Sequence, residues 1–207
     1  MHDTTKKIPT SIWQSLLKAT IPSATYIGAL DSTGFSRTNP SYHYLRRING
    51  AIPRVPVKLS ALIDTKNKKF IDAVIRVLPA HDIRDAKKII KRNKMKKMVA
   101  DKAYDAEWLH ELCIDNGIKA IIPIRKWGKP RVGITRLRYT SNNKFQTRTY
   151  HRRSIIESLF HAIKTTFGGY TNNKKSTTIK AEMYLRLLTY NLFLFTGLFR
   201  TDPFFKS

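Results

Sequence analysis

Five short apolar segments in the first 125 residues limit the folds available to this chain through their order. Strand-like segments follow one another at 24–35, 54–64 and 69–79, and the polar turn TKNK joins the last two as an antiparallel hairpin. Two further strand-like segments, 95–101 and 119–125, each follow a helix-like segment. Three strands in succession and then two helix–strand alternations predict an α/β fold with a mixed sheet and helices on its faces.

The spacing of apolar residues predicts helices before, between and after these strands, at 10–20, 83–93, 106–117, 150–167 and 177–199. The stretch LLTYNLFLFTGLF (187–199) is strongly apolar, but it includes Asn191 and has 13 residues, fewer than the roughly 20 that a membrane span needs. We therefore expect a buried core helix there. The basic segment 126–149 is rich in Gly, Asn and Thr and predicts a loop or a loose hairpin.

The charge balance indicates a polyanionic partner. The chain has 39 Lys and Arg against 14 Asp and Glu, a net charge of +25. Such an excess repels itself unless a polyanion offsets it, and nucleic acid is the usual partner. The charge is spread along the chain without a polybasic cluster beside an amphipathic anchor, which argues against a membrane surface. Cys113 is the sole cysteine and the N-terminus lacks an apolar signal core, so we expect a cytoplasmic protein, associated with nucleic acid through its charge.

Two acidic residues, Asp31 and Asp101, share a position at the end of an apolar strand-like run. A carboxylate at the edge of a buried sheet is costly to desolvate unless a cation compensates it. If the two strands are neighbours in the sheet, the two carboxylates meet. The alternative is that each aspartate starts a turn or caps a helix.

Glu157 is the one acidic residue between Asp115 and Glu182, a stretch that holds fifteen Lys and Arg residues. At about 100° per helical residue, a single stripe about 80° wide contains Tyr150, Arg153, Glu157, His161 and Lys164. A solvated ion pair between Arg153 and Glu157 is the simpler reading. It explains one pair of this stripe and leaves the other three residues unexplained. Glu157 is therefore a candidate to join the two aspartates.

This spacing has a known counterpart. Tyr150, two residues, Arg153, three residues, Glu157, six residues, Lys164 resembles the Y-R-E-K signature of DDE transposases of prokaryotic insertion sequences. Four fixed residue types over fifteen positions make a specific motif.

Two other stretches resemble the same family. ALDSTGF around Asp31 is similar to its first-Asp strand, and VADKAYD around Asp101 is similar to its second-Asp strand, usually written ADKGYD. The hairpin segment and the trailing His81 and Asp82 also resemble the family. The similarity covers roughly residues 24 to 199.

The resemblance implies a ribonuclease H-like mixed sheet with flanking helices. It also implies that Asp31, Asp101 and Glu157 are the catalytic carboxylates and hold two Mg²⁺ ions, or Mn²⁺ in their place. Two metals in such a site activate a water or a 3′-hydroxyl and stabilise the leaving oxygen, so strand cleavage and strand transfer are one chemistry.

The same resemblance implies that Tyr150, Arg153 and Lys164 bind DNA phosphates near the cut. The partners would be the transposon ends and the target DNA, with a homodimer on DNA as the assembly and no membrane.

The resemblance divides the chain into a short N-terminal helical segment (1–23), a catalytic domain (24–200) and a C-terminal tail (201–207). Many relatives carry an N-terminal helical region that recognises terminal repeats, and 23 residues are too few for it. Two readings stay open: either the catalytic surface alone binds the ends, or the protein is an N-terminally truncated copy. Ala103 also replaces the family's common glycine.

Other functions and residue roles also stay open. The main alternative is a non-catalytic or degenerate DNA-binding protein derived from a transposase, which would need no metal. A ribonuclease H-like resolvase or nuclease would share the metals but not the Y-R-E-K spacing. We expect Asp105 to cap the helix that follows it and Asp64 to open a turn. His81 is either a neighbour of the metals or a loop residue, with the loop favoured. Trp127 either stacks on DNA or is partly buried.

Overall fold

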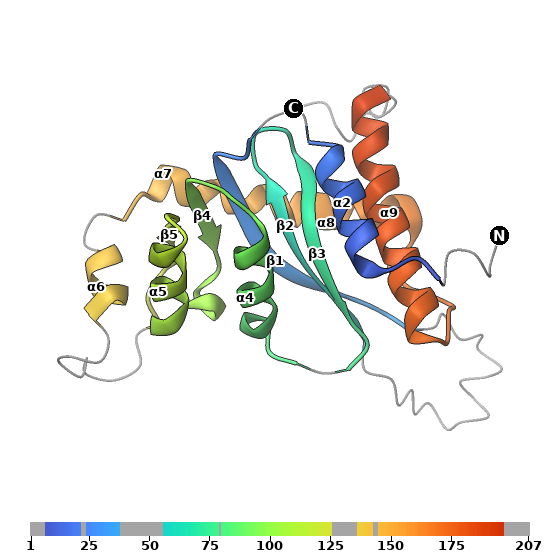
Figure 1. The fold of residues 1–207 in the computed structure, drawn as a ribbon, viewed down its shortest axis with the longest axis horizontal. Coiled ribbons are helices and arrows are strands. Elements are labelled where there is room, and N and C mark those ends of the chain that lie inside the picture. The colour runs from blue at the N-terminus through green and yellow to red at the C-terminus, as the bar shows by residue number, and fades with distance from the viewer. Residues whose placement is uncertain are drawn as a thin grey trace.

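The computed structural model describes residues 7–21, 24–37, 56–78, 80–125, 136–142 and 145–196, which form one five-stranded sheet with helices on both faces (Figure 1). The strands are β1 (Ile27–Phe35), β2 (Val57–Asp64), β3 (Lys69–Arg76), β4 (Lys97–Ala100) and β5 (Lys119–Ile121). The helices are α2 (Thr10–Ala19), α4 (Ile83–Arg92), η1 (Lys102–Tyr104), α5 (Glu107–Asp115), α6 (Arg136–Asn142), α7 (Thr147–Tyr150), η2 (His151–Arg153), α8 (Ser154–Phe167) and α9 (Ser176–Thr196).

The sheet has the order β3-β2-β1-β4-β5. Strand β2 pairs antiparallel with both β1 and β3, whereas β4 lies parallel between β1 and β5. Three meandering strands followed by two crossover strands is the mixed α/β sheet that the segment order predicted. The ribonuclease H-like arrangement is therefore confirmed by the topology.

The two faces of the sheet carry separate hydrophobic cores. Helices α4 and α5 pack on one face, where Leu30, Leu62 and Met98 are buried. Helices α2, α8 and α9 pack on the other face, where Ala29, Ala61 and Val99 are buried (Figure 1). Successive strand side chains point to opposite faces, so the near-continuous apolar runs of β1, β2 and β4 supply both cores.

Helix α9 is a core helix over most of its length. Asn191, the polar residue within its apolar stretch, is fully buried. Its side-chain Oδ1 accepts a hydrogen bond from the Phe70 amide at 2.9 Å, and its Nδ2 donates to the Phe70 carbonyl at 2.8 Å. The amide thereby satisfies backbone groups of the edge strand β3. The expected core helix is thus present, and its outer side near the end carries the exposed Leu192 and Phe195.

The segment expected to be a loop or hairpin after residue 125 contains helices instead. Residues 136–142 form α6, and α7 begins at Thr147, three residues before the predicted helix start. The predicted helix 150–167 is a continuous helical run with a 3₁₀ turn, η2, between α7 and α8. Trp127 lies outside the described residues.

Asp105, the predicted cap of α5, lies where α6 packs on α5 and does not cap the helix. The N-cap of α5 is Ala106, with no side-chain cap. The buried carboxylate of Asp105 instead accepts a hydrogen bond from Arg138 Nε at 2.7 Å and one from the Arg125 amide at 2.7 Å. His110 Nε2 lies 3.4 Å from the same carboxylate. The cap prediction for Asp105 is therefore wrong, because a long-range arginine outcompetes the local helix end.

Asp64 behaves as the sequence predicted. Its carboxylate accepts a hydrogen bond from the Lys66 amide at 2.8 Å and one from Asn67 Nδ2 at 2.6 Å. These contacts close the turn between β2 and β3.

The Asp105 cluster should make stability depend on acid pH. Burial opposes ionisation of Asp105, but the nearby His110 and hydrogen bonds from Arg138 and the Arg125 amide outweigh it and lower its pKa to about 2. The unfolded value is about 3.9. The ionised group therefore adds about 2 kcal/mol above pH 4, and this contribution is lost as pH falls from about 4 to about 2.

Urea unfolding across this range tests the expectation. The stability gap between the wild type and Asp105→Asn should narrow as the pH falls from 4 towards 2. A gap that stays constant with pH would show that the pKa of Asp105 does not change on folding.

Candidate active site

Asp31 and Asp101 lie side by side at the C-terminal end of the parallel pairing between β1 and β4. The parallel register ends with Leu30 opposite Ala100, so Asp31 and Asp101 are the next residues of the two neighbouring segments. Ala29 and Val99, two residues earlier, are buried on the α8 face. Because strand side chains alternate, both aspartates point to that same face.

One detail of the prediction for Asp31 is wrong. The residue does not end its strand: β1 continues to Phe35 because β2 stays paired with it that far. Only the neighbour β4 stops, at Ala100. Asp31 is therefore held rigidly within a paired strand while its flank on the β4 side is open, and its side chain is 18% exposed.

The third acid reaches this place from a helix. The 3₁₀ turn η2 contacts both β1 and β4, and α8 crosses β1. Glu157 lies in the first turn of α8, where the helix dipole favours a negative charge. Its side chain is 54% exposed, so it stands at the open rim of the site.

Arg153 joins two of the three acids. Its Nη1 donates to Asp31 Oδ2 at 3.2 Å, and its Nη2 lies 2.8 Å from Glu157 Oε1. The predicted i, i+4 pair therefore exists, but the same guanidinium also holds a carboxylate from the sheet. This second contact spans 122 residues of sequence.

The acids influence one another electrostatically. Burial raises the pKa of Asp31, while the Ser32 amide and Arg153 act to lower it. The nearby carboxylates of Asp101 and Glu157 raise the pKa of Asp31 further. Asp101 also accepts a hydrogen bond from the Lys102 amide at 2.6 Å. The site thus concentrates negative charge in a partly buried place.

The donor set fits a divalent cation in chemistry, though the acids are not gathered as ligands here. Within the described part of the chain, no three acidic, histidine or cysteine side chains are placed to hold one ion. Carboxylate oxygens are the ligands that Mg²⁺ prefers. A cation here would offset the charge that raises the pKa of Asp31, a task that Arg153 performs in this structure.

The other residues of the stripe, Tyr150, His161 and Lys164, do not all lie beside the acids. Tyr150 is half-buried with its ring 5.3 Å from that of Phe145, and the Arg153 guanidinium carbon lies 5.9 Å from the Tyr150 ring. His161 is exposed and contacts Thr165. Tyr150 and Arg153 thus stay together beside the acids.

Lys164 lies further along α8. Its Nζ is 5.4 Å from the centre of the Phe35 ring, and the guanidinium carbon of Arg186 is 5.7 Å from that ring. Sequence reasoning missed Phe35 and Arg186, because residues so far apart in the chain give no local signal. The structure adds a second cation beside Lys164.

His81 and Asp82, which follow the β2–β3 hairpin, make local structural contacts. His81 is exposed, and its carbonyl accepts a hydrogen bond from the Arg84 amide at 3.1 Å. Asp82 forms an ion pair with Lys58. These contacts support the loop reading of His81.

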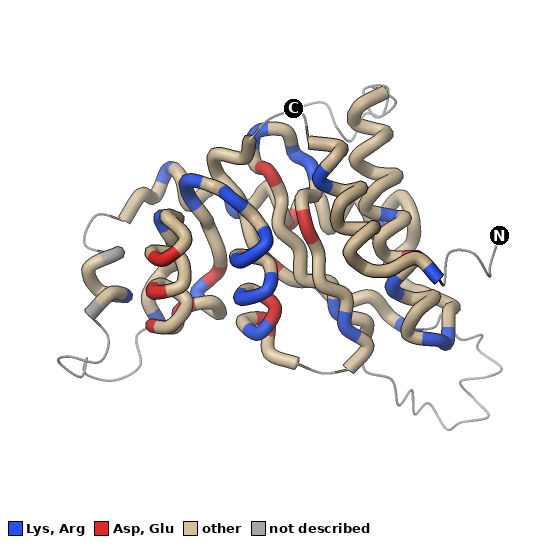
Figure 2. Tube along the Cα trace, viewed as in Figure 1, with Lys and Arg blue, Asp and Glu red and all other residues tan. Residues whose placement is uncertain are grey.

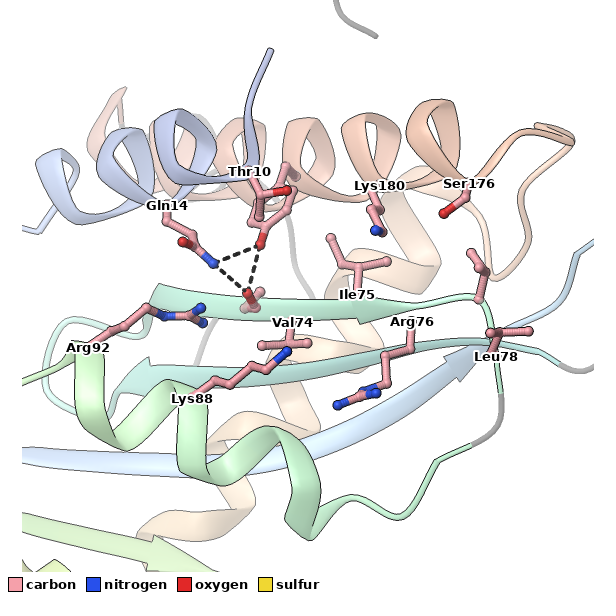
Figure 3. A pocket seen from close by; sticks show the side chains of 13 residues that line it. Thr10, Gln14, Val74, Ile75, Arg76, Leu78, Lys88, Arg92, Ser176 and Lys180 are labelled. Carbon is pink, nitrogen blue, oxygen red and sulfur yellow. Dashed lines mark hydrogen bonds between the residues drawn. The ribbon is translucent and has the colours of Figure 1, made fainter. Parts of the chain in front are cut away.

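A cavity of about 440 Å³ lies elsewhere, beside the edge strand β3 and between α2, α9 and α4 (Figure 3). Among the described residues that line it, no carboxylate is present, and the charged ones are Arg76, Lys88, Arg92 and Lys180. Because four cationic side chains and no carboxylate line it, this cavity does not favour a cation. None of the predicted site residues lines it.

Positive charge is spread over the fold and is densest on α4, which carries Arg84, Lys87, Lys88, Lys91 and Arg92 (Figure 2). Figure 2 shows Lys and Arg on most helices and strands, whereas α5 carries a group of acids. This group consists of Glu107, Glu111 and Asp115. Within the described residues, no helix is long and apolar enough to cross a membrane.

The sequence of this domain matches a known protein family. The family described as "Transposase DDE domain" matches residues 22–192. The chain belongs to the transposase DDE domain family. The resemblance read from the Y-R-E-K spacing is thereby confirmed, and the family match covers the whole sheet, α8 and most of α9 of this transposase domain.

No curated protein matches the transposase domain, and two solved structures align with it at low sequence identity. The catalytic core domain of BIV integrase aligns with a TM-score of 0.44 and 11% identity, over 86% of this chain and 100% of that chain. A simian T-cell lymphotropic virus intasome, solved in complex with the PP2A regulatory subunit B56 gamma, aligns with a TM-score of 0.39 and 14% identity. That match covers 82% of this chain and 48% of the other.

Proposed function

We propose that this transposase domain cleaves DNA strands and transfers them to a target in a metal-dependent reaction during insertion-sequence transposition. Asp31, Asp101 and Glu157 are the proposed catalytic carboxylates and ligands of two Mg²⁺ ions, with Mn²⁺ as a substitute. The observation that carries the proposal is that Arg153 contacts both Asp31 of β1 and Glu157 of α8. Asp101, directly after β4, lies near enough to raise the pKa of Asp31. The family match gives this convergence its chemical meaning.

When bound, the two ions would activate the attacking water or 3′-hydroxyl and stabilise the leaving oxygen. The chain's own contribution is rigid placement. Asp31 is fixed within a paired strand, and the backbone amides of Ser32 and Lys102 orient the Asp31 and Asp101 carboxylates at 2.8 Å and 2.6 Å. Such orientation reduces the rearrangement needed when a ligand binds.

Three further residues are proposed to bind DNA phosphates. Tyr150 and Arg153 adjoin the acids, so a phosphate near the cut lies within their reach. Lys164 lies two helical turns beyond Glu157, about 10 Å along α8. It would hold the strand further from the cut, beside Arg186. Fixed cations at these points offset the charge of the phosphates.

The DNA partners in this proposal are the transposon ends and the target, and the assembly is a homodimer on DNA. The net charge of +25 supports a polyanionic partner. Binding should be steeply salt-dependent, because each phosphate contact releases counterions.

A nicking assay tests the proposed activity. Purified protein should nick supercoiled DNA in Mg²⁺ or Mn²⁺ and not in EDTA. Glu157→Gln keeps the shape of the side chain but removes its charge, so nicking should fall about 10³-fold, equivalent to about 4 kcal/mol of transition-state stabilisation. DNA binding at fixed salt serves as the control and should change little.

Two outcomes would contradict the proposal. Nicking that persists in Glu157→Gln would remove this residue from the catalytic site. Salt-sensitive binding without any metal-dependent nicking would instead support a non-catalytic DNA-binding protein derived from a transposase.

A further inference from the structure

One guanidinium holds two of the three acids together. The Arg153 side chain is 21% exposed and reaches from the last residue of η2 to Asp31 in the sheet and to Glu157 on α8. The two contacts use different nitrogens, Nη1 at 3.2 Å and Nη2 at 2.8 Å. Arginine suits this place because its planar fork presents several donors in fixed directions.

The bridge has an electrostatic purpose. Asp31 is mostly buried, and the carboxylates of Asp101 and Glu157 both act against its ionisation. Arg153 supplies the compensating charge, and its position ties the sheet to the start of α8.

A metal ion would bind the same two carboxylates. Asp31 Oδ2 and Glu157 Oε1 accept from Arg153 in this structure, and both carboxylates belong to the proposed ligand set. A guanidinium and a divalent cation repel each other, so the two cannot share these oxygens at close range. Arg153 and the metal are therefore alternative partners of the same acids.

We propose that Arg153 is a built-in counterion that holds Asp31 and Glu157 in register before metal binds and then yields both carboxylates to the metal. This inference rests on the proposed metal site. Once released, the guanidinium can bind a DNA phosphate with the same paired donors. Arg153 is thus a positioning residue that couples metal loading to contact with the DNA strand.

The test is the metal affinity of the DNA-free protein, measured by titration calorimetry with Mn²⁺. Arg153→Gln removes the competing cation, so its Mn²⁺ affinity should rise about tenfold over the wild type. Arg153→Lys keeps a charge but cannot fork between two carboxylates, so its affinity should fall between the two. Damage to the fold would lower metal affinity, and a rise therefore separates competition from a merely structural role.

Arg152→Gln is the matched control. Arg152 is the exposed neighbour of Arg153 in η2, and its side chain forms no hydrogen bond or ion pair with the described residues. Its substitution removes the same charge from the same turn, so Mn²⁺ affinity should stay within about twofold of the wild type. Equal rises in both variants would reduce the effect to general charge, and would overturn the specific role of Arg153.

Failure of this inference can be told apart from failure of the metal site. If the wild type binds Mn²⁺ and Asp31→Asn abolishes binding, the metal site holds. Unchanged or weaker binding by Arg153→Gln would then overturn the counterion role alone. If Asp31→Asn leaves binding unchanged, or neither the wild type nor Arg153→Gln binds Mn²⁺, the metal site itself is wrong and the counterion role falls with it.

Discussion

Asp31→Asn is expected to abolish metal-dependent DNA cleavage while leaving the fold at least as stable as before. Asparagine keeps the size of the side chain but cannot supply the negative charge that a metal site needs. We expect nicking to fall by about 10³-fold or more, equivalent to at least about 4 kcal/mol of transition-state stabilisation. The rate of nicking of supercoiled DNA in Mg²⁺ measures the loss.

The stability half of this prediction follows from the pKa of Asp31. Burial raises that pKa above its value in the unfolded chain, so the folded protein takes up a proton more readily. The stabilisation from protonation is present at low pH and is lost as pH rises through the folded pKa. At pH 7 the ionised group is thus a cost to folding, and Asn removes it. Thermal unfolding at pH 7 should show no fall in Tm.

Asp115→Asn is the control for both measurements, because Asp115 is exposed on α5 and contacts no site residue. It should change neither the nicking rate nor the Tm. If Asp31→Asn lost activity together with several degrees of Tm, the loss would report unfolding and the catalytic assignment would lose its support.

Asp72→Ala is expected to cause the largest loss of stability. The fully buried carboxylate of Asp72 on β3 accepts hydrogen bonds from Arg92 Nε at 3.0 Å and from Asn93 Nδ2 at 2.6 Å, both at the end of α4. It also accepts from the Ala73 amide at 2.7 Å. Removing the acceptor takes this partner from Arg92 and Ala73, while Asn93 Nδ2 keeps its bond to the Ile89 carbonyl at 2.7 Å. Breaking such a buried pair costs about 3–5 kcal/mol.

Urea denaturation should show this loss as a lower midpoint with an unchanged slope. For a domain stabilised by about 5–15 kcal/mol, the effect is a large share of the total. Asp115→Ala removes the same group from an exposed position and should cost under about 0.5 kcal/mol. A cost below about 1 kcal/mol for Asp72→Ala would mean that water satisfies the orphaned donors.

The sheet and its flanking helices could be predicted because their signals are local. Alternating and continuous apolar runs marked the five strands, and helical spacing marked α2, α4, α5, α8 and α9. Segment 136–142 was predicted as loop and is helical. Its helix is held by Glu107, whose carboxylate accepts a hydrogen bond from the Leu137 amide at 2.7 Å. That stabilisation comes from a distant element, which a local pattern cannot contain.

The residues of the candidate site could be predicted from the sequence, but the contacts between them could not. Their position at the end of apolar runs singled out Asp31 and Asp101, and the spacing within one helix singled out Glu157. The role of Asp105 was predicted wrongly, since its partner Arg138 lies 33 residues away. The Arg153 bridge to Asp31 was not predicted, because helical spacing showed only its local partner.

The sequence alone determined the order of strands, the family and the stripe of Tyr150, Arg153 and Glu157, because apolar periodicity and motif spacing are properties of neighbouring residues. Tertiary structure decided which face of the sheet the aspartates use, since register and pairing with β4 set the direction of each side chain. It also decided that one arginine spans two acids. Such contacts depend on the free energy of packing whole elements together, and no local stretch of sequence encodes that.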